Sequence, residues 1–381
     1  MRGAGQGRSV MNKLSSTERL LRTLSGGEID RVALFDIFHN IGLIEHLAGD
    51  KVTPKNAEDL LCRAARKSLD LIRHFSVPDN LDPVVFKDET GFVYEYQWWT
   101  AHLVERPVFR TSNDTENAVK RDIKIIYDCI AKGKVCRLAR QHVMLFDEKF
   151  DTFEEVKAEF KRVTEKLDGT LMLPPEDVSA VAIATERYDE TGWWYLWYDY
   201  PETAIKYLDA LTDYQLAFIE AFADPAVCPF TQISVMVGTG SSLLYSPGFM
   251  RSEVIPREKK KVDLWKKHGY HVFAFLDGYK WPLIDDFIDI GVEEIHPCET
   301  YCGMDVRTFR EKYPEIPLGQ PIDCTNLLPF GSVEDVKQAV IRAIEDAGGK
   351  KIIIGSTSEI HPEVKVENAL AMYEAARDYR L

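Results

Sequence analysis

The second half of the chain alternates short apolar segments with longer amphipathic ones. The apolar segments read YHVFAFLDG, VEEIHPCE, IPLGQPID and KKIIIGSTS. Patterns typical of amphipathic helices lie between them and at the end of the chain, over residues 246–268, 281–290, 304–313, 332–347 and 363–379. Because a strand, a helix and a second strand form a parallel crossover unit, this order predicts a parallel sheet covered by helices.

The same unit opens the first half. The segment SSTERLLRTLSGGE predicts a helix with Ser15 or Ser16 as its N-cap and Gly26 after its last turn, and RVALFDIF predicts the strand that follows. No phosphate-binding G-x-G-x-x-G follows that strand, which favours a closed (β/α)8 (TIM) barrel over a doubly wound sheet. We expect residues 13–381 to form one barrel domain behind a disordered tail at residues 1–12.

Two aromatic-rich segments, YEYQWWTAH and TGWWYLWYDYPE, interrupt this pattern in the first half. We expect them to be barrel strands or loop insertions near the barrel mouth, where they would stack against a flat ligand. Because adjacent residues of a strand point to opposite faces, at most one Trp of Trp98–Trp99 and one of Trp193–Trp194 should line the barrel. The alternative is that both pairs belong to the core.

Charge and composition exclude several classes of partner. The 381 residues carry a formal net charge of -14, which opposes binding to nucleic acids or anionic membranes. No run of 18 apolar residues and no signal peptide is visible, so we expect a cytoplasmic protein, a monomer or a homodimer, that acts on a small molecule. Seven cysteines in such a chain indicate free thiols or ligands rather than disulfides.

Polar residues at the C-terminal ends of the predicted strands are the candidate site, because a barrel carries its chemistry there. The expected catalytic residues are Asp277, Glu299, Asp323, His39 and His361. The expected substrate-binding residues are Asp36, Trp98, Trp193, Tyr279, Tyr301, Ser356 and Glu359.

Several of these candidates have a purely structural alternative. Asp277 and Asp323 each precede a turn or a helix, so either carboxylate could cap a helix N-terminus. His361 stands next to Pro362, which we expect to open the last helix, and its imidazole could cap that helix.

The segment EIHPCETYCGMD, residues 294–305, suggests a metal site. Its C-x3-C spacing has no second cysteine pair after it, which argues against a structural zinc site, whereas a catalytic zinc needs only three ligands. Cys298 and Cys324 with Asp277, or with His296 or Glu299 in its place, could supply them; buried inert thiols are the alternative.

We expect the side chains of this segment to divide between the two faces of its strand. Glu294 is expected to point outward, while His296 and Cys298 share the other side by alternation.

The phrases SPGFMRSEVIPREKKKVDLWKKHGYHVFAFLDG, IHPCETYCGMDVRTFREKYPEIPLGQPIDC and IIIGSTSEIHPEVKVENALAMYEAARDY resemble the uroporphyrinogen decarboxylase superfamily. This superfamily also includes methyltransferases that move methyl groups between small methylated compounds, corrinoid proteins and thiols or folates. The resemblance covers about the last third of the chain and, more weakly, DRVALFDIF. It implies a (β/α)8 barrel and leaves the activity open.

The chain departs from two patterns within this superfamily. True decarboxylases carry an Arg-rich segment resembling RQAGRY, whereas VALFDIFHNIG follows Arg31 here. Zinc-dependent relatives that alkylate thiols show His-x-Cys where this chain has Phe275 and Asp277, and a later Cys where it has Ser356 to Ser358. The metal is therefore either absent or relocated to Cys298, Cys324 and Asp277.

The resemblance implies a methyltransferase as the first hypothesis, with a methoxylated aromatic as a possible methyl donor. The implied acceptor is a corrinoid protein or tetrahydrofolate. Asp277 or Glu299 would act as acid, Asp323 would orient it, and His361 or His39 would hydrogen-bond the substrate.

Two alternatives remain. A decarboxylase of the uroporphyrinogen type would bring carboxylates to a mouth lined by Asp36, Asp277, Glu299 and Asp323, where like charges repel. A catalytically inactive barrel that binds an aromatic or corrinoid ligand would explain the loss of the usual zinc residues.

Overall fold

The computed structural model describes residues 13–73, 76–88, 90–139, 150–175 and 177–381. The predicted disordered tail at residues 1–12 lies outside this range. Within the described residues, no helix is both long and apolar enough to cross a membrane.

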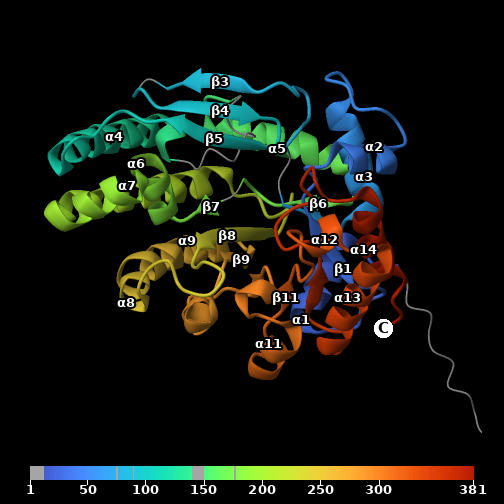
Figure 1. Cartoon of the computed structure of the whole chain (residues 1–381). Helices are drawn as coiled ribbons and strands as arrows, with labels where there is room; N and C mark the ends of the chain where they lie inside the picture. The colour runs from blue at the N-terminus through green and yellow to red at the C-terminus, as the bar shows by residue number, and fades with distance from the viewer. Residues whose placement is uncertain (1–12, 74–75, 89, 140–149, 176) are drawn as a thin grey trace, which may run out of the picture.

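A curled parallel sheet forms the centre of the molecule (Figure 1). Its strands among the described residues are β1 (Ala33–Asp36), β2 (Leu71–Ile72), β6 (Leu171–Met172), β7 (Asp177–Val178), β8 (Phe230–Met236), β9 (His271–Asp277), β10 (Glu294–His296), β11 (Leu318–Gly319) and β12 (Ile352–Ile354). They follow the order β6-β2-β1-β12-β11-β10-β9-β8-β7. The two edge strands, β6 and β7, are consecutive in the chain. Counted together as one position, they leave eight positions, as a (β/α)8 barrel requires.

Helices alternate with the strands and cover the sheet from outside. Those that follow the alternation are α1 (Ser16–Ser25), α2 (Ile41–Ala48), α3 (Ala57–Ser68), α5 (Phe153–Leu167), α7 (Pro201–Phe222), α9 (Ile255–Lys267), α10 (Ile284–Asp289), α11 (Val306–Lys312), α12 (Leu327–Phe330), α13 (Val333–Asp346) and α14 (Val366–Asp378). Helix α1 has the predicted caps: the Ser15 side chain accepts from the Glu18 backbone, and Gly26 adopts φ 72°. Helix α14 begins at Val366, three residues later than we expected from Pro362.

The aromatic segments lie outside the barrel sheet. YEYQWWTAH forms part of a separate antiparallel sheet of β3 (Val84–Lys87), β4 (Val93–Gln97) and β5 (Thr100–Glu105), at the top of Figure 1. TGWWYLWYDYPE ends helix α6 (Ala180–Asp199), beside helix α4 (Ser112–Lys132), and begins α7. The expectation of barrel strands was therefore wrong, because neither segment pairs with the parallel sheet.

The barrel interior is filled by aromatic rings around the hydrogen-bonded side chains of Glu294 and His296. Phe35 of β1 contacts the rings of Phe273 in β9 and His296 in β10, with centroids 6.4 and 5.3 Å apart. Strand β1 is not a neighbour of β9 or β10 in the sheet, so these contacts cross the interior. In the register Phe273 lies beside Glu294, and Phe275 beside His296, which places all four on this inner face.

Glu294 therefore points inward, and the expectation that it points outward was wrong. Its carboxylate is fully buried and lies 2.6 Å from Nδ1 of His296. Side chains two residues apart on a strand share a face, so the rule that placed His296 inside should have placed Glu294 there as well. Gly319 makes room for this carboxylate, because a Cβ at that position would come within 2.2 Å of it.

Candidate active site

Asp277 ends strand β9 at the barrel mouth. Its carboxyl group is largely shielded from solvent and has no hydrogen-bond donor among the described residues. Burial, and secondarily the negative charge of Glu299, raise the pKa of Asp277 to about 6. At pH 6 about half of this group is protonated, and at pH 7 about a tenth, so it can act as an acid in mildly acidic to neutral solution.

Glu299 is the opposite case, a buried carboxylate surrounded by donors. It accepts hydrogen bonds from the Gly278 backbone N–H at 3.0 Å, Lys280 Nζ at 2.8 Å and the Tyr301 hydroxyl at 2.9 Å. Lys280 is also buried and donates to the Pro297 carbonyl at 3.1 Å. These bonds fix the position of the Glu299 side chain beside Asp277.

A tight turn brings these groups together. Gly278 adopts φ 84°, and a Cβ on it would come within 2.0 Å of the Gly238 carbonyl oxygen after strand β8. Only glycine fits this close approach. Tyr279 follows in the same turn, where its backbone N–H donates to the Thr239 carbonyl at 2.7 Å and its side chain is half-buried.

Arg73 reaches the mouth from the end of strand β2. Its guanidinium carbon lies 4.4 Å above the centre of the Phe275 ring. Phe275 stands where the resemblance led us to expect a polar residue, and here the ring serves as a platform for a cation. The positive charge of Arg73 also acts on Asp277 and partly offsets the rise in its pKa.

Arg73 and Lys280 were not among the predicted site residues, although the sequence holds a signal for both. Arg73 directly follows the apolar run LDLI, so the strand-end rule would have found it. Lys280 lies three residues after Asp277. Both were overlooked because only acidic, imidazole, thiol and hydroxyl groups were considered.

His39 lies on the other side of the mouth. Its backbone N–H donates to the Ile360 carbonyl at 3.0 Å, which places it beside Glu359. Burial, as the largest effect, lowers the pKa of His39 to about 4, so the imidazole is neutral at pH 7. Its ring centre is 6.0 Å from Trp98 and 5.7 Å from Trp99.

Both tryptophans therefore approach His39, and the alternation on which we based the expectation for this pair does not hold here. The reason is that residues 98 and 99 form the turn between β4 and β5, where strand alternation does not apply. Trp193, in contrast, is fully buried in helix α6, with its ring centre 6.1 Å from those of Trp197 and Tyr207.

Asp36 is held by hydrogen bonds from other parts of the fold. Its fully buried carboxyl group accepts from the Ser356 backbone at 3.0 Å and hydroxyl at 2.6 Å, and from Tyr373 of α14 at 2.9 Å. Burial still raises the pKa of Asp36 to about 6. The structure thus joins Asp36 and Ser356 to each other and to an outer helix.

The remaining predicted residues make local contacts. Asp323 accepts from the backbone of Thr325 and Asn326 at 2.7 and 3.0 Å, the turn-capping arrangement that we considered as its alternative. The Nε2 atom of His361 lies 2.8 Å from the Cys324 carbonyl oxygen. Glu359 accepts from Ser358 at 2.7 Å.

The donor groups do not fit the relocated zinc site. Within the described residues, no three His, Cys, Asp or Glu side chains are grouped as a metal ion would require. Cys298 donates to the Met304 carbonyl at 3.5 Å, and Cys324 accepts from the Thr357 hydroxyl at 3.3 Å. Burial raises the pKa of Cys298 to about 12. Because the three donors are not grouped, we derive no chemical step through a metal.

Beneath the mouth, His296 links the interior pair to strand β8. Its Nε2 atom lies 3.3 Å from the side-chain oxygen of Gln232, and burial raises the pKa of its partner Glu294. The Phe275 ring lies 5.5 Å from the His296 ring and thus separates this network from Arg73. The side chains directly beneath the mouth are therefore closely packed around a buried polar network.

The mouth therefore combines a protonatable carboxyl group, a fixed carboxylate and a guanidinium group within one aromatic-walled site. When two carboxyl groups have such different surroundings, one can act as a general acid while the other provides a fixed negative charge. The arrangement is suited to protonating a leaving group or a carbanion.

The family model described as uroporphyrinogen decarboxylase (URO-D) matches residues 145–379, more than half of the chain. A solved structure described as a methyltransferase from Methanosarcina mazei is similar, with a TM-score of 0.63 and 18% sequence identity, over 96% of this chain and 98% of that chain. No curated protein matches.

Proposed function

The chain belongs to the uroporphyrinogen decarboxylase family, and within it we propose that this protein is a methyltransferase that takes a methyl group from a small methyl ether. The observation that carries the proposal is Asp277, a carboxyl group with a pKa of about 6 at the end of β9. The similar protein described as a methyltransferase supports the same reaction class.

The proposed step is a displacement at the methyl carbon. A nucleophilic acceptor attacks that carbon, the bond from the methyl carbon to the ether oxygen breaks, and the proton of Asp277 passes to the departing oxygen. The products are an alcohol or phenol, the methylated acceptor and the Asp277 carboxylate. We take the acceptor to be a reduced corrinoid on a partner protein, with tetrahydrofolate as the other candidate.

Neighbouring groups have distinct roles in this scheme. Arg73 stabilises the negative charge that develops on the departing oxygen, because it lies over Phe275 beside the acid. The negative charge of Glu299 raises the pKa of Asp277, and the positive charge of Lys280, its partner, offsets part of that rise. Trp98 and Trp99 provide aromatic surface next to neutral His39 for a methoxylated ring.

A transfer assay tests the proposal. The purified protein would be incubated with a reduced corrinoid protein and a panel of aromatic and aliphatic methyl ethers, with formation of the methylated corrinoid followed by absorbance. We expect turnover with at least one aromatic ether. Absence of turnover with every ether, with both a corrinoid protein and tetrahydrofolate as acceptors, would contradict it.

Decarboxylation of a small acid is a second candidate, and Arg73 with Lys280 favours it. We expected four carboxylates at the mouth to repel an acidic substrate. Two of them, Asp36 and Asp323, form structural hydrogen bonds instead, and the two cations attract such a substrate. An acid such as Asp277 could then protonate the carbanion left by CO2. Incubation with uroporphyrinogen and chromatography of the products separates the two proposals, because only decarboxylation yields products with fewer carboxylates.

A further inference from the structure

Two cysteines meet where helix α4 ends, outside the barrel sheet. Cys129 lies in the last turn of α4, and Cys136 follows seven positions later in the chain. Gly133 ends the helix with φ 59°, and the backbone N–H of Lys134 donates to the Cys129 carbonyl at 3.0 Å. Because the chain reverses at this glycine, it returns Cys136 to the end of the helix.

The returning segment is held by hydrogen bonds and packing. Val135 donates its backbone N–H to the Asp151 carbonyl at 3.0 Å, and Cys136 donates its own to the Tyr214 hydroxyl of α7 at 2.9 Å. The next residues, Arg137–Ala139, form a short 3-10 helix that contacts α4. The fold therefore sets the position of Cys136 against the end of α4.

The two thiols interact directly, and both cysteines are reduced in this structure. They share a side-chain hydrogen bond, which as the largest effect, followed by burial, raises the pKa of Cys136. The Cys136 thiol is thus the donor and the Cys129 sulfur the acceptor. Such a bond favours the thiolate form of Cys129, which is the nucleophile in thiol–disulfide exchange.

Access to solvent differs between the two cysteines. Cys129 is half-buried, whereas Cys136 is only 2% exposed, so a small reagent can reach the first thiol and not the second. The other five cysteines are all buried. Burial raises the pKa of Cys62, Cys228 and Cys298 to about 12, which makes these thiols poor nucleophiles. Cys129 is therefore the preferred point of attack.

We propose that Cys129 and Cys136 form a redox modification site, which a low-molecular-weight disulfide converts into an intramolecular disulfide. The Cys129 thiolate attacks one sulfur of the reagent, the S–S bond of the reagent breaks, and one small thiolate leaves. Cys136 then attacks the Cys129 sulfur and releases the second small thiolate. The two departing thiolates take up the protons of the two cysteines through solvent. The cysteine pair is oxidised by two electrons, and the reagent is reduced to two thiols.

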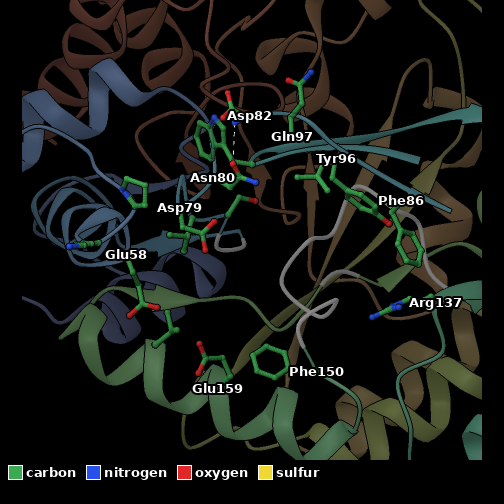
Figure 2. Close-up of a pocket in the computed structure, with 17 residues that line it drawn as sticks. Glu58, Asp79, Asn80, Asp82, Phe86, Tyr96, Gln97, Arg137, Phe150 and Glu159 are labelled. Carbon is green, nitrogen blue, oxygen red and sulfur yellow. Dashed lines mark hydrogen bonds between the residues drawn. The ribbon is translucent and has the colours of Figure 1, made fainter. Parts of the chain in front are cut away.

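The pair adjoins a cavity of about 520 Å³ beside the antiparallel sheet. Arg137, the residue after Cys136, lines this cavity together with Phe86 and Tyr96 (Figure 2). A disulfide would therefore tie the backbone next to this wall of the cavity to helix α4. The inference goes beyond the proposed methyl transfer and does not depend on it.

Thiol counting on the full-length protein tests the inference. The reduced protein is incubated with oxidised glutathione, the remaining thiols are alkylated, and peptide mass spectrometry locates the modified cysteines. We expect the loss of two of the seven thiols and one disulfide between Cys129 and Cys136. Dithiothreitol should restore both thiols.

Matched variants separate the roles of the two cysteines. Cys136→Ala should stop the reaction at the mixed disulfide, with one glutathione on Cys129. Cys129→Ala should slow the first loss of a thiol by about tenfold or more, because the other thiols are buried. Cys62→Ala removes a buried thiol of α3 as the control and should form the same disulfide as the wild type. Thermal unfolding confirms that each variant is folded.

Three results would overturn the inference: retention of all seven thiols, a disulfide between other cysteines such as Cys298 and Cys302, or an equal rate of thiol loss in Cys129→Ala and the wild type. An intramolecular disulfide in Cys136→Ala would overturn it as well. Because this assay follows thiols and the transfer assay follows the corrinoid, failure of this inference and failure of the proposed function are distinguishable.

Discussion

The two ends of the barrel use buried carboxylates in different ways. At the N-terminal ends of the strands, Asp70 accepts from the guanidinium groups of Arg19 and Arg31 and from the Leu34 backbone at 2.9 Å. At the mouth, Asp277 has no donor among the described residues, and its pKa is raised. A fully bonded carboxylate holds the fold together, whereas one without a donor retains its proton for chemistry.

Asp277→Asn should have the largest effect on activity. Loss of a general acid slows a reaction by about 10²–10⁴-fold, so we expect a decrease of that order in the rate of methyl transfer. Asp289→Asn, at an exposed position on α10, is the control and should keep full activity. A rate of transfer close to wild type in Asp277→Asn would remove Asp277 from the mechanism.

Asp70→Ala should have the largest effect on stability. It leaves two guanidinium groups without their buried partner, which costs about 3–5 kcal/mol of the free energy of unfolding. Chemical denaturation measures this loss. Asp263→Ala breaks the exposed pair with Lys259 and should change stability by less than about 1 kcal/mol. Equal losses of stability in the two variants would show that the ion pairs of Asp70 do not stabilise the fold.

The pH dependence should distinguish the two ends further. Methyl transfer needs protonated Asp277, so its rate should fall as the pH rises through about 6.

The same raised pKa affects stability. The carboxyl group of Asp277 has its ordinary pKa of 3.8 in the unfolded chain and a pKa of about 6 in the folded protein. The stability that its bound proton contributes is therefore complete below about pH 4 and is lost as the pH rises through about 6. Asp36 shifts in the same direction and should preserve part of this dependence in Asp277→Asn. Unfolding curves of the wild type and of Asp277→Asn between pH 4 and 8 measure the difference. Identical dependence of stability on pH in the two proteins would contradict this prediction.

Phe275→Leu should have the smallest effect. Removing the platform of Arg73 costs about 1 kcal/mol of interaction, which corresponds to about a fivefold decrease in kcat/KM. Because Arg73 then lowers the pKa of Asp277 less, the midpoint of the pH–rate profile should move upward. Phe230→Leu, at the lower end of β8, loses a similar ring and should leave that midpoint unchanged. A shift in both variants would point to a general loosening of the barrel.

Much of the fold could be predicted from local patterns. The caps of α1, the apolar runs of β1, β9, β10 and β12, and the helices between the later strands lie close to their expected places. Each of these signals is contained in a few adjacent residues. The antiparallel sheet was missed because short aromatic runs fit a barrel strand and an inserted sheet equally well.

The candidate site could be predicted only in part. The strand-end rule named Asp277 and Glu299, which the structure brings together, and it also named Asp36 and Asp323, whose hydrogen bonds are structural. A strand end tells where a residue lies along the barrel, but not which way its side chain points or which donors meet it.

The sequence by itself determined the order of strands and helices, because periodicity and caps act over one or two turns. Tertiary structure decided the chemical state of each carboxyl group. Asp36 meets Ser356, which is 320 positions away in the chain, and Arg73 after β2 meets Phe275 of β9 only because the sheet is curled. Whether a buried carboxyl group is bonded or keeps its proton depends on such distant neighbours, which no local pattern encodes.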